Sequence, residues 1–182
     1  SRIYLNGRMV KKKLLKRTLK QVSQGYALQR FLNAAAGRGA YPIKFNGSLF
    51  TVDGPGYGPD YRRWGGCYWW QNTRLPYWAC LASGDFDLME PLFRMYLSIL
   101  PLRKETTKIY YGHKGAFFPE TIYFWGTPCN DDFGWERKGH PKHLMLNRYI
   151  RREWQGGIEL CQMMLDRYEY THEEAFLKEK LL

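Results

Sequence analysis

Residues 64–78 read Trp64-Gly-Gly-Cys-Tyr-Trp-Trp-Gln-Asn-Thr-Arg-Leu-Pro-Tyr-Trp78, the most unusual stretch of the chain. It sets large flat rings beside the planar polar groups of Gln71, Asn72 and Arg74. An aromatic face can cover the C–H side of a sugar ring, and amide or guanidinium groups can hold its hydroxyls by paired hydrogen bonds. The stretch therefore indicates a sugar site. The structural alternative is a tryptophan-rich core whose indole N–H groups find local partners.

Apolar residues recur at helical spacing on both sides of this stretch, which predicts a mainly helical fold. Helices are expected over residues 9–36, 70–83, 86–111 and 143–169, with a fifth opened by a capping box at Thr171 and Glu174. Asp85 or Ser83 is the expected cap of the third helix, and Pro101 is expected to interrupt it. The apolar side of the first helix is formed by Leu15, Leu19, Val22 and Tyr26, and that of the fourth by Trp154, Ile158, Cys161, Leu165 and Tyr168.

Two segments of about 28 residues, 41–68 and 112–140, lose the helical period and are rich in glycine and proline. A short strand is expected within residues 41–52, and one short strand pair is expected in the fold. Six of the seven tryptophans lie between residues 64 and 135. Because long loops rich in aromatic residues are typical of binding sites, we expect the two segments to form one pocket. Its expected substrate-binding residues are Trp64, Trp70, Gln71, Arg74, Trp78, Trp125 and Trp154.

The net charge of +11 comes from one segment. Residues 1–40 hold ten Lys or Arg and no acid, whereas the rest of the chain holds 18 basic and 17 acidic residues. A basic cluster can bind nucleic acid, with aromatic rings as stacking platforms for bases. Here the rings and the basic cluster lie in different segments, so a solvated helix face is the preferred interpretation and no nucleic-acid partner is expected.

The chain offers carboxylates for acid–base chemistry but no recognisable metal site. Glycoside hydrolysis ordinarily uses two carboxyl groups. Glu120 follows the apolar residues Gly115-Ala-Phe-Phe-Pro119, and this apolar surrounding is expected to raise its pKa. Glu120 is therefore the candidate catalytic carboxylate. Asp131 and Asp132 are typical of an exposed turn. The four cysteines form no C-x-x-C pair, so neither a metal nor another cofactor is expected, and no apolar run is long enough for a membrane span.

Three groups of motifs resemble the (α/α)6-barrel, or six-hairpin, glycosidases, in the order that this superfamily has them. The first group is Tyr26-Ala-Leu-Gln-Arg-Phe31 with Arg38 through Gly47. The second is Trp64-Gly-Gly and Gln71 through Trp78, then Leu88 through Phe93. The third is Trp125-Gly126, Trp154 through Leu160, and Tyr168 through Thr171. The chain is most similar to inverting α-L-fucosidases and their uncharacterised relatives, over about residues 26–180.

The resemblance implies a role for Asn72. Counted back from Tyr77-Trp78, it falls where the fucosidases have an asparagine that helps to position the attacking water. They have a second asparagine two residues earlier, where this chain has Trp70 with Gln71 beside it. Because Trp70 stands in place of the second asparagine, the resemblance does not carry over the complete catalytic machinery or the specificity for fucose. The resemblance also implies that the general acid lies on a later loop than Tyr168.

Together these points predict a single domain over residues 1–182 that is the first half of an (α/α)6 toroid, with about five helices. We expect it to be part of a longer protein, because the chain starts at Ser1 and stops within a helical pattern at Leu182. The remainder of the same barrel is then its structural partner and a carbohydrate its substrate. The expected function is a glycoside hydrolase of inverting mechanism, and the alternative is a sugar-binding module without catalysis. Glycosidases of this kind are often exported, so the resemblance implies a secreted or periplasmic location.

Overall fold

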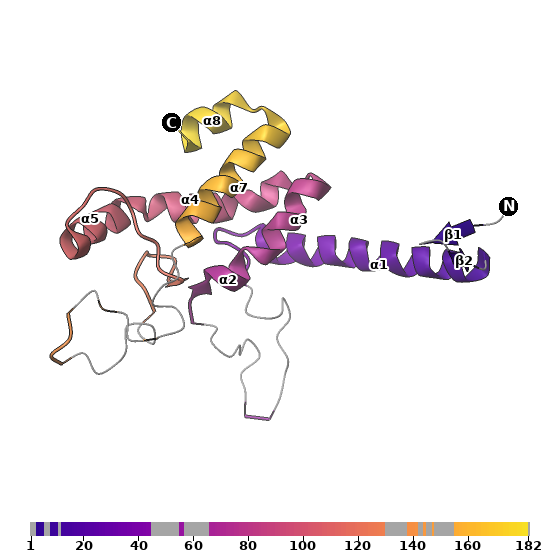
Figure 1. Ribbon diagram of the computed structural model, residues 1–182, viewed down its shortest axis with the longest axis horizontal. Helices are drawn as coiled ribbons and strands as arrows, with labels where there is room; N and C mark the ends of the chain where they lie inside the picture. The colour runs from indigo at the N-terminus through magenta and orange to yellow at the C-terminus, as the bar shows by residue number, and fades with distance from the viewer. Residues whose placement is uncertain are drawn as a thin grey trace. The chain divides into compact units, whose positions relative to one another are not determined.

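A computed structural model describes residues 3–5, 8–10, 12–44, 55–56, 66–129, 138–141, 144, 147 and 155–181. The chain divides into two compact units, Ser1–Ala35 and Ala36–Leu182. The described part is mainly helical, as predicted, and is consistent with part of an (α/α)6 toroid (Figure 1). No helix within it combines the length and the apolar character that a membrane crossing requires.

The first unit contains a hairpin and most of a long helix. Strands β1 (Ile3–Leu5) and β2 (Arg8–Val10) pair antiparallel, and α1 runs over Lys12–Gly37. The predicted helix over residues 9–36 is therefore wrong at its start. Asn6-Gly7 is the sequence signal that could have found the hairpin, since Asn-Gly commonly joins two strands. Leu19, Val22 and Tyr26, on the predicted apolar side, are exposed.

In the second unit, prolines mark where consecutive helices begin. The predicted helix over 70–83 is divided into α2 (Trp70–Thr73) and α3 (Leu75–Ser83). The one over 86–111 is divided into a 3-10 turn, η1 (Phe86–Met89), and two helices, α4 (Glu90–Ser98) and α5 (Leu100–Tyr111). Pro76, Pro91 and Pro101 each occupy the first turn of a helix, where a missing N–H breaks no intrahelical bond. The predicted interruption at Pro101 is confirmed.

Asp85, one of the two predicted caps, does occupy the N-cap position of η1, but without the capping hydrogen bond. Its carboxylate instead accepts a hydrogen bond from the Ser83 hydroxyl at 2.6 Å. Each candidate cap thus satisfies the other. The preceding helix α3 ends at Gly84, whose φ of 71° gives the left-handed turn typical of a helix C-terminus.

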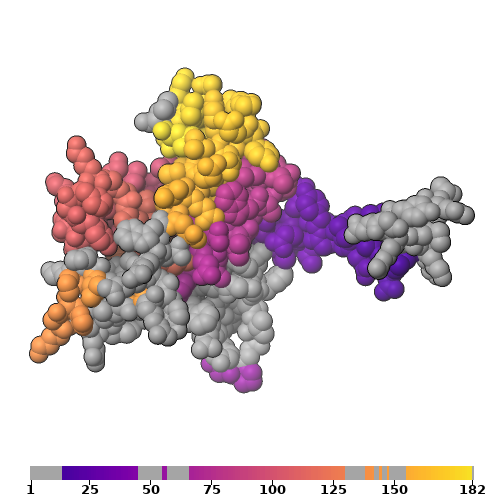
Figure 2. Space-filling model, in the orientation of Figure 1, coloured from indigo at the N-terminus to yellow at the C-terminus, as the bar shows by residue number. Residues whose placement is uncertain are grey.

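Helix α7 (Gln155–Thr171) buries a different face from the one predicted. Ile158 is 75% exposed and Leu165 45%, whereas Leu160, Met163 and Met164 are buried. Both sets of residues have helical spacing, so periodicity could not choose between them. Contact with α3 decides which set is buried, as the adjoining surfaces of the two helices in Figure 2 show. The helix also starts later than the predicted residue 143, since Leu144 and Asn147 lie outside it; Trp154 and His143 are not among the described residues.

The predicted capping box of the last helix, α8 (Glu174–Lys180), is also wrong. Thr171 is the final residue of α7, and its hydroxyl donates to the Arg167 carbonyl at 3.0 Å. His172 then turns the chain with φ of 52°, so that Glu173 occupies the N-cap position without a side-chain cap bond. The Thr171 hydroxyl thus bonds within α7, and its oxygen also accepts from the N–H of Glu173 at 3.4 Å, but it does not occupy the N-cap position of α8.

The core of the second unit is formed by large side chains from α2, α3, η1, α4 and α7, together with Ile43 and Ile122. Its most buried large members are Ile43, Trp70, Tyr77, Leu88, Met89, Leu92, Phe93, Tyr96, Ile122 and Met163. In addition to the β1–β2 hairpin, β3 (Tyr68–Trp69) and β4 (Thr121–Ile122) pair antiparallel, so the described residues contain two short strand pairs where one was expected. The strand expected within 41–52 is absent from its described portion, residues 41–44, and the remainder lies outside the described residues.

A buried arginine holds the loop that leads to and from β4. Arg103 of α5 is 3% exposed and donates to the carbonyls of Phe117 at 2.8 Å and Gly126 at 3.2 Å. Gly126 has φ of +96°, and a Cβ there would lie 3.0 Å from the Cβ of Ile99. This loop is therefore pressed against α5, and residue 126 has to be glycine for steric as well as conformational reasons.

Gly126→Ala is expected to lower the free energy of unfolding by about 2–4 kcal/mol, because it adds both backbone strain and a clash with Ile99. The matched control is Gly112→Ala, where φ is +73° but nothing lies within 4 Å of the added Cβ. This control should lose only the backbone contribution, about 1–2 kcal/mol. Urea unfolding followed by circular dichroism measures both values. Equal losses in the two variants would show that the loop does not pack closely on α5.

Candidate functional site

The predicted site residues that the structure describes lie on α2 and α3 and around β4. Trp70, Gln71 and Asn72 belong to α2, Arg74 joins α2 to α3, and Trp78 belongs to α3. Glu120 directly precedes β4, and Trp125 follows it in the loop to residue 129. Trp64, Trp154, Asp131 and Asp132 are outside the described residues. Apart from Trp125, the described candidates thus lie on or next to the short helix α2.

Strand pairing brings Glu120 to the beginning of α2. Because Trp69 pairs with Thr121, Glu120 lies next to the first residues of the helix. The Trp70 N–H donates to the Glu120 backbone carbonyl at 2.8 Å, and the Gln71 N–H donates to its carboxylate Oε1 at 2.7 Å. The first N–H groups of a helix have no intrahelical acceptor, and Glu120 satisfies two of them. At 3% exposure its side chain anchors α2.

Trp70 is a core residue in this arrangement. It is 1% exposed, and its ring meets Tyr96 edge-on with a centroid separation of 5.4 Å. A Cβ on Gly156 of α7 would lie 3.3 Å from the Trp70 ring, so the glycine allows α7 to approach closely. In the described structure Trp70 therefore offers no ring face to solvent, whereas Trp78 is half-buried.

Three buried phenols surround this part of the core. Burial raises the pKa of Tyr68 to about 12, with the neighbouring Tyr41 contributing less. Burial also raises the pKa of Tyr77, whose oxygen accepts a hydrogen bond from the Ile43 N–H at 2.6 Å. The pKa of Tyr96 is raised first by burial and then by the charge of Glu120. All three phenols are consequently protonated at neutral pH.

Glu159 of α7 is the central residue that sequence analysis missed. One of its carboxylate oxygens accepts from the Trp70 indole N–H at 2.8 Å. The other accepts from the Arg74 guanidinium at 2.5 Å and from the Trp78 indole N–H at 3.2 Å. The signal that could have found it is a lone acid between Ile158 and Leu160 in an apolar helical stretch. Three predicted sugar-binding residues are thus tied to one carboxylate.

The amides of Gln71 and Asn72 are left uncommitted by these contacts. Gln71 is exposed and Asn72 half-buried. Their backbone groups take part in hydrogen bonds of α2 and its ends, but neither side-chain amide is hydrogen-bonded to another residue of the described structure. The helix therefore combines a fixed backbone with two side chains that can still hold a water molecule or a sugar hydroxyl.

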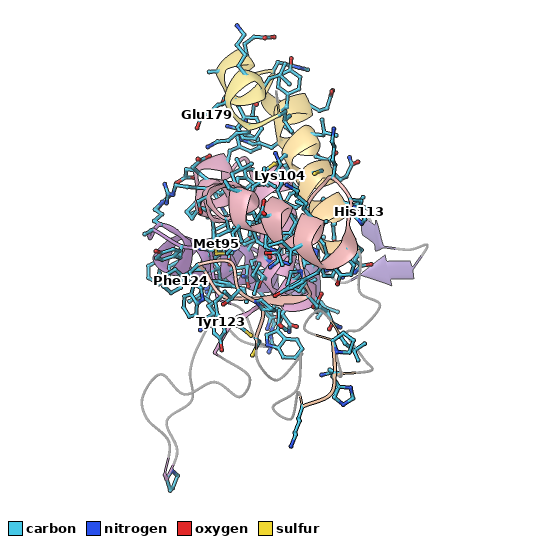
Figure 3. All side chains as sticks on the ribbon, turned by 90° about the vertical axis from the view of Figure 1, so that its left-hand side faces the viewer. Met95, Lys104, His113, Tyr123, Phe124 and Glu179 are labelled. Atoms are coloured by element: carbon cyan, nitrogen blue, oxygen red, sulfur yellow. The ribbon has the colours of Figure 1, made fainter. Side chains whose placement is uncertain are left out.

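Trp125 belongs to a separate aromatic group. It is 50% exposed, lies parallel to Tyr123 at a centroid separation of 4.4 Å, and donates its indole N–H to the Thr127 hydroxyl. Phe124 contacts both Trp125 and Tyr41 with centroid separations of 4.7 Å. Figure 3 shows Tyr123 and Phe124 at the margin of the helical part. The ring contacts of Trp125 in the described structure are thus with its own loop and not with α2.

Comparison with known families decides the affiliation of the chain. The model of the glycosyl hydrolase family 95 catalytic domain matches residues 26–182. The chain belongs to glycosyl hydrolase family 95. This confirms the resemblance to six-hairpin glycosidases and makes glycoside hydrolysis the activity class of the family.

The family 95 match includes all the candidate site residues, from Trp64 to Trp154, and leaves most of the basic segment, residues 1–25, outside it. No curated protein matches the chain, and no solved structure matches it either. In the described part of this family 95 chain, no group of three or more His, Cys, Asp or Glu side chains is placed to hold a metal ion.

Proposed function

We propose that this chain supplies the water-holding part of an inverting glycoside hydrolase that acts on an oligo- or polysaccharide. The observation that carries the proposal is the state of α2. Glu120 and Glu159 fix the helix and its surroundings, while the Asn72 amide remains uncommitted among the described residues. An amide on a fixed backbone can hold the attacking water in one orientation. The water is then already placed for attack, which lowers the entropic cost of reaching the transition state.

The chemistry follows from the residue type. In an inverting enzyme, water attacks the anomeric carbon on the face opposite to the leaving oxygen, which a carboxylic acid protonates. An amide cannot form the glycosyl-enzyme intermediate of a retaining enzyme, but it can orient the water while a carboxylate accepts the proton. Glu120 is less suited to accept this proton than to anchor α2, because it is 3% exposed and one of its oxygens is bonded to the Gln71 N–H. The resemblance to six-hairpin glycosidases implies that the general acid lies on a later loop than Tyr168, and the base is assigned to a carboxylate other than Glu120.

The test is the anomeric configuration of the first-formed sugar. We expect proton NMR of a fucosylated trisaccharide, treated with the full-length protein, to show a product inverted relative to the bond that is cleaved. Inversion follows from a single displacement by water. A retained product would overturn the assignment of Asn72, because retention requires a nucleophile that an amide does not provide.

One observation favours the alternative of a sugar-binding module without hydrolysis. The resemblance places a second asparagine at position 70, and this chain has a tryptophan there that is buried in the core. No second amide can therefore come from that position, and Gln71 is the neighbouring amide that remains. A trisaccharide that binds to the full-length protein but is not cleaved would favour this alternative.

A further inference from the structure

We infer that Glu159 is a positioning residue, whose carboxylate sets the orientation of the Trp78 ring and the Arg74 guanidinium beside Asn72. The inference rests on the proposed function only in what it says about sugar. The arrangement of the three donors is a property of the structure itself.

The contacts connect two segments that are distant in the sequence. Glu159 lies in the second turn of α7, whereas its partners Trp70, Arg74 and Trp78 belong to α2, the junction and α3. The side chain of Glu159 is 16% exposed and that of Arg74 27%. Hydrogen bonds to an ionised acceptor are stronger than neutral ones, and partial burial limits their competition with water. The carboxylate thus holds the Arg74 guanidinium and the two indole N–H groups in one arrangement.

Only a carboxylate fits these donors. Two indole N–H groups and a guanidinium all need an acceptor, and an ionised carboxylate accepts at two oxygens and donates at none. A glutamine at the same position would keep one carbonyl oxygen and present an NH2 group to the remaining donors. At least one indole or the guanidinium would then lose its partner, and the adjoining side chains would be free to reorient.

The position of the anchor explains how α7 can act on the sugar without contacting it. Trp78 is half-buried and Arg74 is partly exposed. The Arg74 Nε also donates to the Gln71 carbonyl at 3.3 Å, so a small rotation of Arg74 changes the surface at the end of α2. Since the oxygens of Glu159 are occupied by these three donors, it is assigned to orientation and not to proton transfer. When a positioning residue is replaced, the group that it holds can shift by about 1 Å, and a shift of that size can change affinity or rate substantially.

The test is Glu159→Gln in the 182-residue chain, with tryptophan indole N–H signals observed by nitrogen–proton NMR. We expect the Trp70 and Trp78 signals to move and the Trp125 signal, whose donor is bonded to Thr127, to stay. Trp78→Phe identifies the Trp78 signal, and this variant avoids substituting the buried Trp70. Affinity for a fucosylated trisaccharide, measured by calorimetry, is expected to fall about tenfold, as for loss of one charge-assisted hydrogen bond.

The matched control is Glu173→Gln, because Glu173 also accepts from a guanidinium, that of Arg167, at 2.8 Å. It should leave the three indole signals and the affinity unchanged. Unmoved Trp70 and Trp78 signals in a folded Glu159→Gln protein would overturn the inference, as would an unchanged affinity where the parent chain binds the sugar. If the full-length protein neither binds nor cleaves the sugar while the signals move, the proposed function fails and the positioning of the two indoles by Glu159 stands.

Discussion

Trp70→Ala is expected to lower the free energy of unfolding by about 3–5 kcal/mol, the usual loss when a fully buried aromatic side chain is removed. Trp70 is 1% exposed, contacts Tyr96, approaches Gly156 of α7 and donates its indole N–H to Glu159. The substitution leaves a cavity between α2 and α7 and removes one donor from the carboxylate. Urea denaturation of the second unit, followed by circular dichroism, measures the effect.

The control for this prediction is Trp125→Ala. Both tryptophans have the sequence character of a sugar-binding residue, but Trp125 is 50% exposed and stacks only on its own loop among the described residues. Its removal should change the free energy of unfolding by no more than about 1 kcal/mol. If Trp70→Ala and Trp125→Ala lowered the free energy of unfolding equally little, Trp70 would not belong to the core. That result would favour its original assignment to the sugar site.

Asn72→Ala in the full-length protein is expected to lower kcat by about 100-fold or more with little change in KM. The proposed water is held for the transition state and not for substrate affinity, and loss of an interaction made only in the transition state lowers kcat and kcat/KM together. Steady-state kinetics on a fucosylated trisaccharide separate the two constants. Full activity in this variant would show that Asn72 does not hold the water.

Gln71→Ala is the matched control, since it removes the neighbouring amide from the same helix. Gln71 is proposed to contact the sugar, so its loss should raise KM and leave kcat nearly unchanged, as expected for uniform binding. Equal effects of the two substitutions on kcat would mean that α2 as a whole, rather than the Asn72 amide, matters for the reaction.

The amino-acid sequence by itself determined the helical class, the approximate positions of the helices and the family. These features depend only on residues close together in the sequence or on the order in which motifs follow one another along the chain. A helical period is visible within four or five turns, Pro101 marks the predicted interruption, and motif order needs no contact information. The same information identified α2 as the segment that carries Asn72, although the roles of the site residues remain predictions.

Only the tertiary structure decided which faces and which partners are used. In α7 two apolar stripes have the same spacing, and the packing of α3 selects the stripe with Leu160 and Met163. Trp70 and Trp125 look alike in the sequence, yet one is in the core and the other is half exposed, because burial depends on what packs against a side chain. Glu159 receives its three donors from residues at least 81 positions away. Such a contact leaves no periodic signal in the sequence, because it exists only once the helices are packed.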